Sequence, residues 1–311
     1  MKKIILSNLL IFFFIFCIIE FASYLFIKID TKDSIDNHNK TSKRQLTIRY
    51  APIVNAEQEY ENHRKIDYGD KKKPSILFFG CSYTYGLFND QNETLPYYIT
   101  ERTGRTTVNR GVTGGCIYNM FHDLKSEKFY KEIKDVPAPD YIIYIWINDN
   151  LNRITNPYMT IITAADYPYY EIKPDWFYED GKLVNRPIQK WKKPFYALYC
   201  TKVWNLLYAE SFVTEKRDEK MLRYFITARN VCKDKFPNAK FIIIEYKDKS
   251  FELMKPILRN GLKKENISIL DAEELAGHEL ESDKWRASDK EHPNGKAFED
   301  ITKGLVKELN L

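Results

Sequence analysis

The chain has 311 residues, of which 44% are hydrophobic, 29% charged and 15% aromatic, and its formal net charge at pH 7 is +5. This composition fits a globular protein with one large or two small domains, and it excludes collagen-like, disordered and disulfide-scaffold classes. The longest cationic run, Lys71 to Lys73, is too short to indicate a nucleic-acid partner.

The first 28 residues contain an apolar run long enough to cross a bilayer. Residues 4–27 are 24 in number, and a helix rising 1.5 Å per residue needs about 20 residues for a hydrocarbon core of about 30 Å. The run ends in Tyr24, Leu25 and Phe26 rather than in the small residues of a cleavage site. We therefore expect an uncleaved single-pass membrane anchor over residues 1–28. Glu20 is near one end of the run, where an acid is tolerated.

The residues leave open which side of the membrane the rest of the chain occupies. More Lys and Arg residues follow the apolar run than precede it, which by itself favours a cytoplasmic domain. Long translocated domains often override this bias. The cysteines after the anchor are too scattered for a disulfide framework and fit either compartment.

Residues 29–73 are polar and charged and are expected to form a juxtamembrane spacer that packs partly onto a domain over 74–311. In that domain, short apolar runs alternate with helix-like segments. Strands buried on both faces are expected at 75–80, 106–111, 141–148, 240–246 and 267–272. Amphipathic helices are expected at 116–133, 217–236 and 293–309, the last with Pro293 in its first turn. The pattern predicts an α/β fold with a mostly parallel five-stranded sheet covered by helices on both faces, and chemistry beyond the carboxyl ends of the strands.

Residues 155–212 interrupt this alternation and contain 14 aromatic residues. We expect an insertion with a hairpin that turns at Asp180 and Gly181, followed by a helix over about 194–209. Aromatic residues at this density form a satellite core or a membrane-facing surface more often than a sugar-binding surface, and all three roles stay open.

A candidate nucleophile follows the first expected strand, in GCSYTYG at residues 80–86. Ser82 lies there on a strand-to-helix turn with a glycine on each side, which exposes its hydroxyl near backbone N–H groups. A helix N-cap serine is the alternative interpretation.

A candidate base lies more than 200 residues downstream, in DKEH at residues 289–292. Asp289, three positions before His292, can accept the Nδ1 proton and leave Nε2 free to take a proton from a serine. Taken alone, such a pair is more often a surface feature. Gly114 follows the second strand and Asn148 ends the third, so a backbone N–H of Gly114 and the side-chain amide of Asn148 could form an oxyanion hole with the N–H of Ser82.

These four blocks, in this order, resemble the SGNH (GDSL-type) hydrolases. They read GCSYTYG (80–86), NRGVTG (109–114), WIND (146–149) and DKEH (289–292). Over residues 74–311 the resemblance implies a flavodoxin-like three-layer α/β/α sandwich, with Ser82 as nucleophile, His292 as base and Asp289 as its orienting acid. Ser82, Gly114 and Asn148 would donate to the oxyanion, and neither a cofactor nor a metal is implied. Residues 87–95 and an anchor that carries a glutamate are similar to a membrane-anchored bacterial subgroup.

The chain departs from the family pattern at two positions. Cys81 stands where the family has aspartate, and we expect its side chain to point into the fold because neighbouring strand residues face opposite ways. Trp146 replaces a glycine and is expected either to narrow the pocket or to pack under the insertion.

The expected function is that of a membrane-anchored serine esterase that acts through an acyl-serine intermediate on small acyl esters, with acetyl groups on cell-envelope polysaccharide as the favoured substrate. The resemblance also favours an extracytoplasmic domain. Two alternatives remain: an O-acyltransferase with the same residues, and a catalytically silent subunit that binds glycans or acts as a scaffold. A nucleotide- or flavin-binding module is disfavoured because no glycine-rich phosphate loop follows the first strand.

Overall fold

The computed structural model describes Ile18 and residues 63–154, 175–186, 211–247 and 254–311. The chain divides into two compact units, and nearly all the described residues belong to the one made of Ile53–Thr155, Lys173–Pro187 and Arg217–Leu311. Except for Ile18, the expected anchor lies outside the described residues, as do the helix expected over 194–209 and most of the aromatic insertion. Within the described part of the chain, no helix is long and apolar enough to span a membrane.

The described helices and strands follow one another in α/β alternation. In chain order they are β1 (Ser75–Gly80), α4 (Ser82–Tyr85), η2 (Gln91–Glu93), α5 (Leu95–Thr103), β2 (Thr107–Gly111), α6 (Ile117–Lys125), α7 (Glu127–Glu132), β3 (Pro139–Trp146), α8 (Asp149–Ile154), β4 (Asp175–Glu179), β5 (Lys182–Arg186), α12 (Ser211–Lys235), β6 (Lys240–Glu245), α13 (Pro256–Lys264), β7 (Ser268–Asp271), α14 (Ala272–Ala276), η4 (Asp283–Trp285) and α15 (Gly295–Leu309).

The main sheet has five strands in the order β2-β1-β3-β6-β7, and every neighbouring pair is parallel. This order is that of the flavodoxin-like doubly wound fold, whose functional sites lie beyond the carboxyl ends of the strands, where the strand order reverses. At that reversal β1 lies between β2 and β3, with Gly80 paired to Gly111 on one side and to Ile145 on the other. The segments that follow these three strands therefore leave the sheet at one place.

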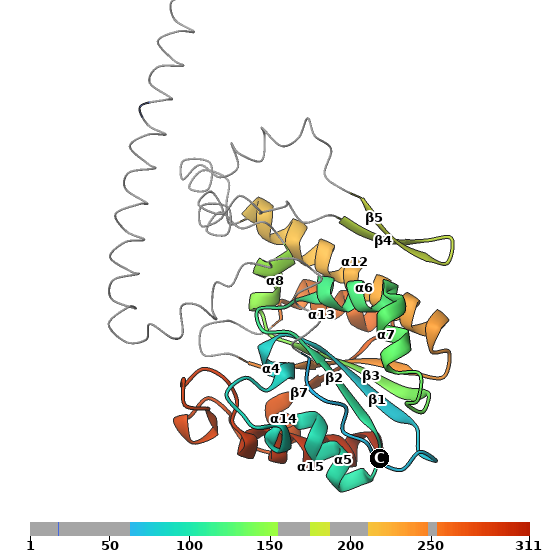
Figure 1. Ribbon diagram of the computed structural model, residues 1–311. Helices are drawn as coiled ribbons and strands as arrows, with labels where there is room; N and C mark the ends of the chain where they lie inside the picture. The colour runs from blue at the N-terminus through green and yellow to red at the C-terminus, as the bar shows by residue number, and fades with distance from the viewer. Residues whose placement is uncertain (1–17, 19–62, 155–174, 187–210, 248–253) are drawn as a thin grey trace, which may run out of the picture. The chain divides into compact units, whose positions relative to one another are not determined.

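Helices cover both faces of the sheet, so the expected three layers are present (Figure 1). Successive side chains of a strand point to opposite faces. Accordingly, Ile76 and Phe78 of β1 pack with residues of α5, α14 and α15, whereas Leu77 and Phe79 pack with residues of α6, α7, α12 and α13. Strands β1, β3 and β6 are thus mostly buried on both sides, as their apolar sequences predict, whereas the edge strand β7 is only partly buried.

Two elements differ from the expectations. The helix expected over 116–133 is two helices, because the backbone of Ser126 is extended and its hydroxyl accepts a hydrogen bond from the N–H of Lys128, starting α7. Pro293 is not in the first turn of the last helix. It precedes the N-cap residue Asn294 and forms an isolated bridge with Arg286.

The hairpin expected at Asp180 and Gly181 is confirmed. Strands β4 and β5 pair antiparallel, and both turn residues have positive φ angles, 48° and 71°. A two-residue turn of this kind matches the twist of the strands on either side, and Asp-Gly is among the sequences that adopt it.

Candidate active site

Ser82 is positioned by the sharp turn between β1 and α4. Gly80 has a φ of 146°, and a Cβ atom there would lie 2.2 Å from Thr84 Oγ1 and 2.7 Å from the carbonyl oxygen of Ile145, so only glycine fits. The carbonyl of Cys81 accepts hydrogen bonds from the N–H groups of Thr84 and Tyr85 and closes the first turn of α4. Ser82 is the first residue of this short helix and is only 4% exposed.

The three residues expected to form a triad come together. His292 Nε2 lies 2.8 Å from Ser82 Oγ, and His292 Nδ1 lies 2.5 Å from Asp289 Oδ2. The hydroxyl and the imidazole are separated by 210 positions in the sequence, so only the fold places them in contact. A serine, a histidine and a carboxylate linked in this order can activate the serine as a nucleophile.

Asp289 is held by its own turn as well as by the imidazole. Its Oδ1 accepts hydrogen bonds from the backbone N–H groups of Glu291 and His292, both at 3.1 Å. Burial of the carboxyl group would raise its pKa, but the hydrogen bond and charge of His292 and these two N–H donors outweigh burial and lower the pKa of Asp289 below its ordinary value. The acid of the triad is therefore ionised at neutral pH and accepts from Nδ1.

The segment that carries the base is tied to the segment that follows the nucleophile. Asn89 Nδ2 donates to the carbonyl of Pro293 at 2.9 Å, and the hydroxyl of Tyr83 donates to the carbonyl of Glu291 at 3.1 Å. The ring of Tyr83 also lies 5.1 Å from that of His292, centroid to centroid. These contacts fix the position of the imidazole relative to Ser82.

The oxyanion donors expected at Gly114 and Asn148 lie in the segments that follow β2 and β3, the two neighbours of β1. Gly114 has a φ of 71°, and no atom lies within 4 Å of where its Cβ would be. Asn148 Oδ1 is buried, and none of the described residues donates a hydrogen bond to it. The topology places both residues at the same sheet edge as Ser82, and their role as donors remains a prediction.

Two supporting residues had not been expected from the sequence. Arg64 donates to the carbonyls of Tyr85, Gly86 and Asn89 at 2.7–3.0 Å, so it holds the end of α4 and the turn after it. Asn109, fully buried in β2, donates to the carbonyl of Thr84 at 2.9 Å. Spacing gives no signal for either contact because the partners are 21–25 positions apart and belong to different elements.

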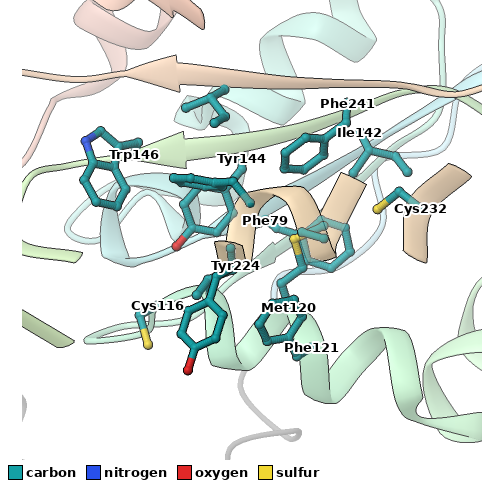
Figure 2. Packing of buried hydrophobic residues seen from close by; sticks show 14 of the residues in the cluster. Phe79, Cys116, Met120, Phe121, Ile142, Tyr144, Trp146, Tyr224, Cys232 and Phe241 are labelled. Carbon is teal, nitrogen blue, oxygen red and sulfur yellow. The ribbon is translucent and has the colours of Figure 1, made fainter. Parts of the chain in front are cut away.

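The two departures from the SGNH pattern are accommodated in the core. Cys81 is fully buried and packs in the cluster on the α5 and α15 face, which confirms that it points into the fold. Trp146 is also fully buried and packs edge-on against Phe225 of α12, 5.5 Å between centroids, on the opposite face (Figure 2). Trp146 therefore belongs to the core beneath α12, and does not narrow a pocket.

Asp289, Glu291 and His292 also place three potential metal-ligand atoms within 4.8 Å of one another. Both imidazole nitrogens of His292 already take part in hydrogen bonds, to Ser82 and to Asp289. A cation bound here would displace one of these bonds, so the arrangement fits the hydrogen-bonded triad better than a metal site.

No model of a known protein family matches the sequence, and no curated protein matches it. Among solved structures, the chain is similar to an acetyl xylan esterase, Est2A, from the rumen bacterium Butyrivibrio proteoclasticus, with 14% identity, a TM-score of 0.42, and coverage of 76% of this chain and 64% of that chain. It is similar to a two-domain esterase active on acetylated mannans, with 13% identity, a TM-score of 0.42, and coverage of 76% and 49%. It is also similar to a lipase, Lip_vut3, from a goat rumen metagenome, with 10% identity, a TM-score of 0.40, and coverage of 76% and 97%.

The chain thus spans less than two thirds of the length of the two esterases named first. Similarity at this level says nothing about what the chain binds or does. The three residues that meet at the carboxyl edge of the sheet are the evidence for its chemistry.

Proposed function

We propose that the protein is a serine ester hydrolase of the SGNH type. The observation that carries this proposal is the hydrogen-bonded chain from Ser82 Oγ through His292 to Asp289, with distances of 2.8 Å and 2.5 Å. The serine lies at the carboxyl edge of a parallel sheet, where α/β folds collect their chemistry.

The proposed reaction begins when Ser82 Oγ attacks the ester carbonyl and His292 Nε2 takes its proton. The negative charge on the carbonyl oxygen is stabilised by N–H donors, for which we propose the backbone of Ser82 and Gly114 and the side chain of Asn148. The tetrahedral intermediate then collapses. The bond to the alcohol oxygen breaks, and the departing alkoxide takes the proton from the imidazolium.

A second half-reaction releases the acyl group. Water gives a proton to His292 Nε2 and attacks the acyl-serine carbonyl, and the proton returns to Ser82 Oγ when the carboxylic acid leaves. Asp289 accepts the Nδ1 hydrogen bond throughout and stabilises the imidazolium in both halves. An acceptor hydroxyl in place of water would make the same residues a transferase.

We further propose that the esters are small, with acetyl groups on cell-envelope polysaccharide as the favoured class, and that residues 1–28 anchor the domain to a membrane with the site on the extracytoplasmic side. The apolar run over residues 4–27 supports the anchor. The intact triad disfavours the catalytically silent alternative, since a subunit that only binds glycan has no need of an ordered nucleophile and base.

Replacement of the nucleophile tests the proposal. Ser82→Ala in the full chain should lower turnover of 4-nitrophenyl acetate by about 10³-fold or more and abolish labelling by a fluorophosphonate probe, because it removes the hydroxyl that lies against His292 Nε2. Thr84→Ser, which keeps a hydroxyl two positions away on the same helix, is the matched control and should retain labelling. Equal labelling of wild type and Ser82→Ala would overturn the assignment of the nucleophile.

Protease accessibility in cells tests the anchor separately. A tag placed after Leu311 should remain with the membrane fraction in a high-salt wash. A protease added outside the inner membrane should digest this tag. Digestion only after permeabilisation of that membrane would contradict the extracytoplasmic placement.

A further inference from the structure

A polar cleft lies directly beside the loop that carries the triad base. Its volume is about 470 Å³, within the range of small-molecule sites. The residues around it that matter here are Phe88, Glu93 and Tyr98 after the nucleophile turn, and Ser288, Lys296 and Glu299 around the base loop and α15. Ser288 is the residue before the triad acid, so the cleft adjoins the catalytic machinery.

Phe88 connects the cleft to the base. Its side chain lines the cleft, and its ring lies 5.6 Å from that of His292, centroid to centroid. The residue is 41% exposed, although burial would be the favourable state for a large apolar side chain. His292 itself does not line the cleft, so a ligand that covers this exposed ring would be linked to the imidazole through Phe88.

The backbone at Phe88 is held in a conformation that such a residue normally avoids. Its φ is 67°, in the left-handed region that favours glycine. The turn is fixed from both sides, because Arg64 donates to the carbonyls of Gly86 and Asn89 and the N–H of Asn89 donates to the carbonyl of Gly86. A strained, exposed aromatic residue at a site points to a role in function rather than in packing.

The cleft is lined by two acids, Glu93 and Glu299, and by two cations, Arg286 and Lys296, so its formal charges balance and favour an uncharged, hydrogen-bonding ligand. The carboxylate of Glu299 is already paired with Arg102 at 2.7 Å and with Lys303 at 3.3 Å. Glu93 accepts a hydrogen bond from the N–H of Asp90 at 3.2 Å. The charges at the walls are thus partly engaged by the protein, whereas carboxylate oxygens and the hydroxyls of Tyr98 and Ser288 still offer partners for hydroxyl groups.

The position of the cleft indicates which half of the ester it receives. In the proposed reaction His292 gives its proton to the departing alcohol, so the alcohol half lies on the imidazole side. The acyl half lies toward Gly114 and Asn148, in the segments that follow β2 and β3. The cleft is on the imidazole side, because Phe88 contacts His292 and Ser288 precedes Asp289.

We propose that this cleft is the subsite for the alcohol half of the ester and that it binds a sugar ring stacked on Phe88. The C–H face of a sugar packs on an aromatic ring, and its hydroxyls reach the polar walls. This inference rests on the proposed esterase function and assigns the surface that binds the sugar half of its ester.

Kinetics with two esters test the subsite in the full chain. Phe88→Ala should lower kcat/KM for an O-acetylated xylo-oligosaccharide about tenfold relative to kcat/KM for ethyl acetate, mainly through KM, because the ethyl alcohol half has no ring to stack on Phe88. Phe88→Trp should keep the preference. Tyr68→Ala removes an aromatic side chain that is 61% exposed, next to the start of β2, and is the matched control. Equal losses for both esters, or no loss for the oligosaccharide, would overturn the proposal.

Binding without turnover separates this proposal from the esterase proposal. Calorimetry should detect the deacetylated xylo-oligosaccharide on Ser82→Ala and not on the Ser82→Ala/Phe88→Ala variant. If the wild type hydrolyses neither ester, the esterase proposal fails while this comparison still decides the subsite. Phe88→Gly should also leave the melting temperature unchanged or raise it, because glycine suits the left-handed φ. A clear drop would show that the ring serves the fold instead.

Discussion

At Asp289, three donors converge on one carboxylate. The imidazole of His292 occupies one oxygen, and two backbone N–H groups of the same turn occupy the other. These donors keep the pKa of Asp289 below its ordinary value despite burial. The carboxylate therefore stays ionised from about pH 5 to 8. Over that range Asp289 keeps the negative charge that can stabilise a protonated imidazole beside it.

Asp289→Asn should lower kcat by about 10³–10⁴-fold, because a neutral amide cannot stabilise the imidazolium and favours the wrong tautomer of the base. Initial rates with 4-nitrophenyl acetate measure this effect. Glu291→Gln, at an exposed acid two positions away, is the control and should change kcat less than twofold. Equal kcat values for Asp289→Asn and Glu291→Gln would argue against a role for the Asp289 carboxylate in catalysis.

At the scale of elements, the nucleophile depends on how the four-residue helix α4 is held. The carbonyl of Thr84 accepts from Asn109 of β2, and the carbonyls of Tyr85 and Gly86 accept from Arg64. A helix this short has no stability of its own, because nucleation is costly and its last carbonyls have no intrahelical partners. The buried side chain of Asn109 and the partly buried side chain of Arg64 replace those partners.

Asn109→Ala should reduce kcat more than it changes KM and should destabilise the fold by about 1–3 kcal/mol, because the carbonyl of Thr84 and the N–H of Gly111 lose a buried partner. Ser75→Ala is the matched control, since it removes a buried hydrogen bond to Pro137 at the opposite end of β1. It should lower stability with kcat retained. Thermal denaturation and steady-state kinetics on both variants give the comparison. Equal effects on kcat would show that Asn109 acts through stability alone.

The sequence predicts those parts of the fold and site whose cause is local. Strands β1, β3 and β6 are rich in consecutive apolar residues, whereas β2 reads TVNRG and is not. The Asp180–Gly181 turn and the blocks around Ser82 and His292 are short motifs that can be read directly from the sequence. The break at Ser126 could not be predicted from periodicity, because a single side-chain acceptor outweighs an uninterrupted amphipathic pattern. The contacts of Arg64 and Asn89 arise between segments distant in sequence, so spacing does not reveal them.

At the scale of the whole domain, the fold reaches back before residue 74. Asp67 exchanges two backbone hydrogen bonds with Thr107 at the start of β2, at 3.0 and 3.1 Å. Burial raises the pKa of its carboxyl group to about 6, against a hydrogen bond from Gln91 and the charge of Arg64, which lower it. Its Oδ2 is buried, and none of the described residues donates to it. Ionisation of Asp67 therefore lowers the stability of the folded protein.

Asp67→Asn should raise the melting temperature at pH 7–8 and leave it nearly unchanged near pH 4. A raised folded-state pKa means that the folded protein keeps the proton while the unfolded chain loses it. Stability therefore decreases as pH rises through the window between 3.8 and about 6. The asparagine removes this penalty and keeps an oxygen for Gln91. Asp135→Asn, at an exposed position, is the control for loss of one negative charge. If the melting temperature rose equally at both pH values, titration of Asp67 would not be the cause of the rise.

In the sequence, the hairpin of β4 and β5 lies between Ser82 and the other two triad residues. Its turn residues, Asp180 and Gly181, are exposed and lie after Ser82 but before Asp289 and His292. A backbone opened at such a turn disturbs few buried groups. A break of the backbone at this point would give two fragments that each carry an incomplete triad, so the proposed esterase activity would arise only on their reassociation. If each fragment were fused to one of two interacting proteins, binding of those proteins would bring the fragments together. Hydrolysis of an ester would then report the interaction.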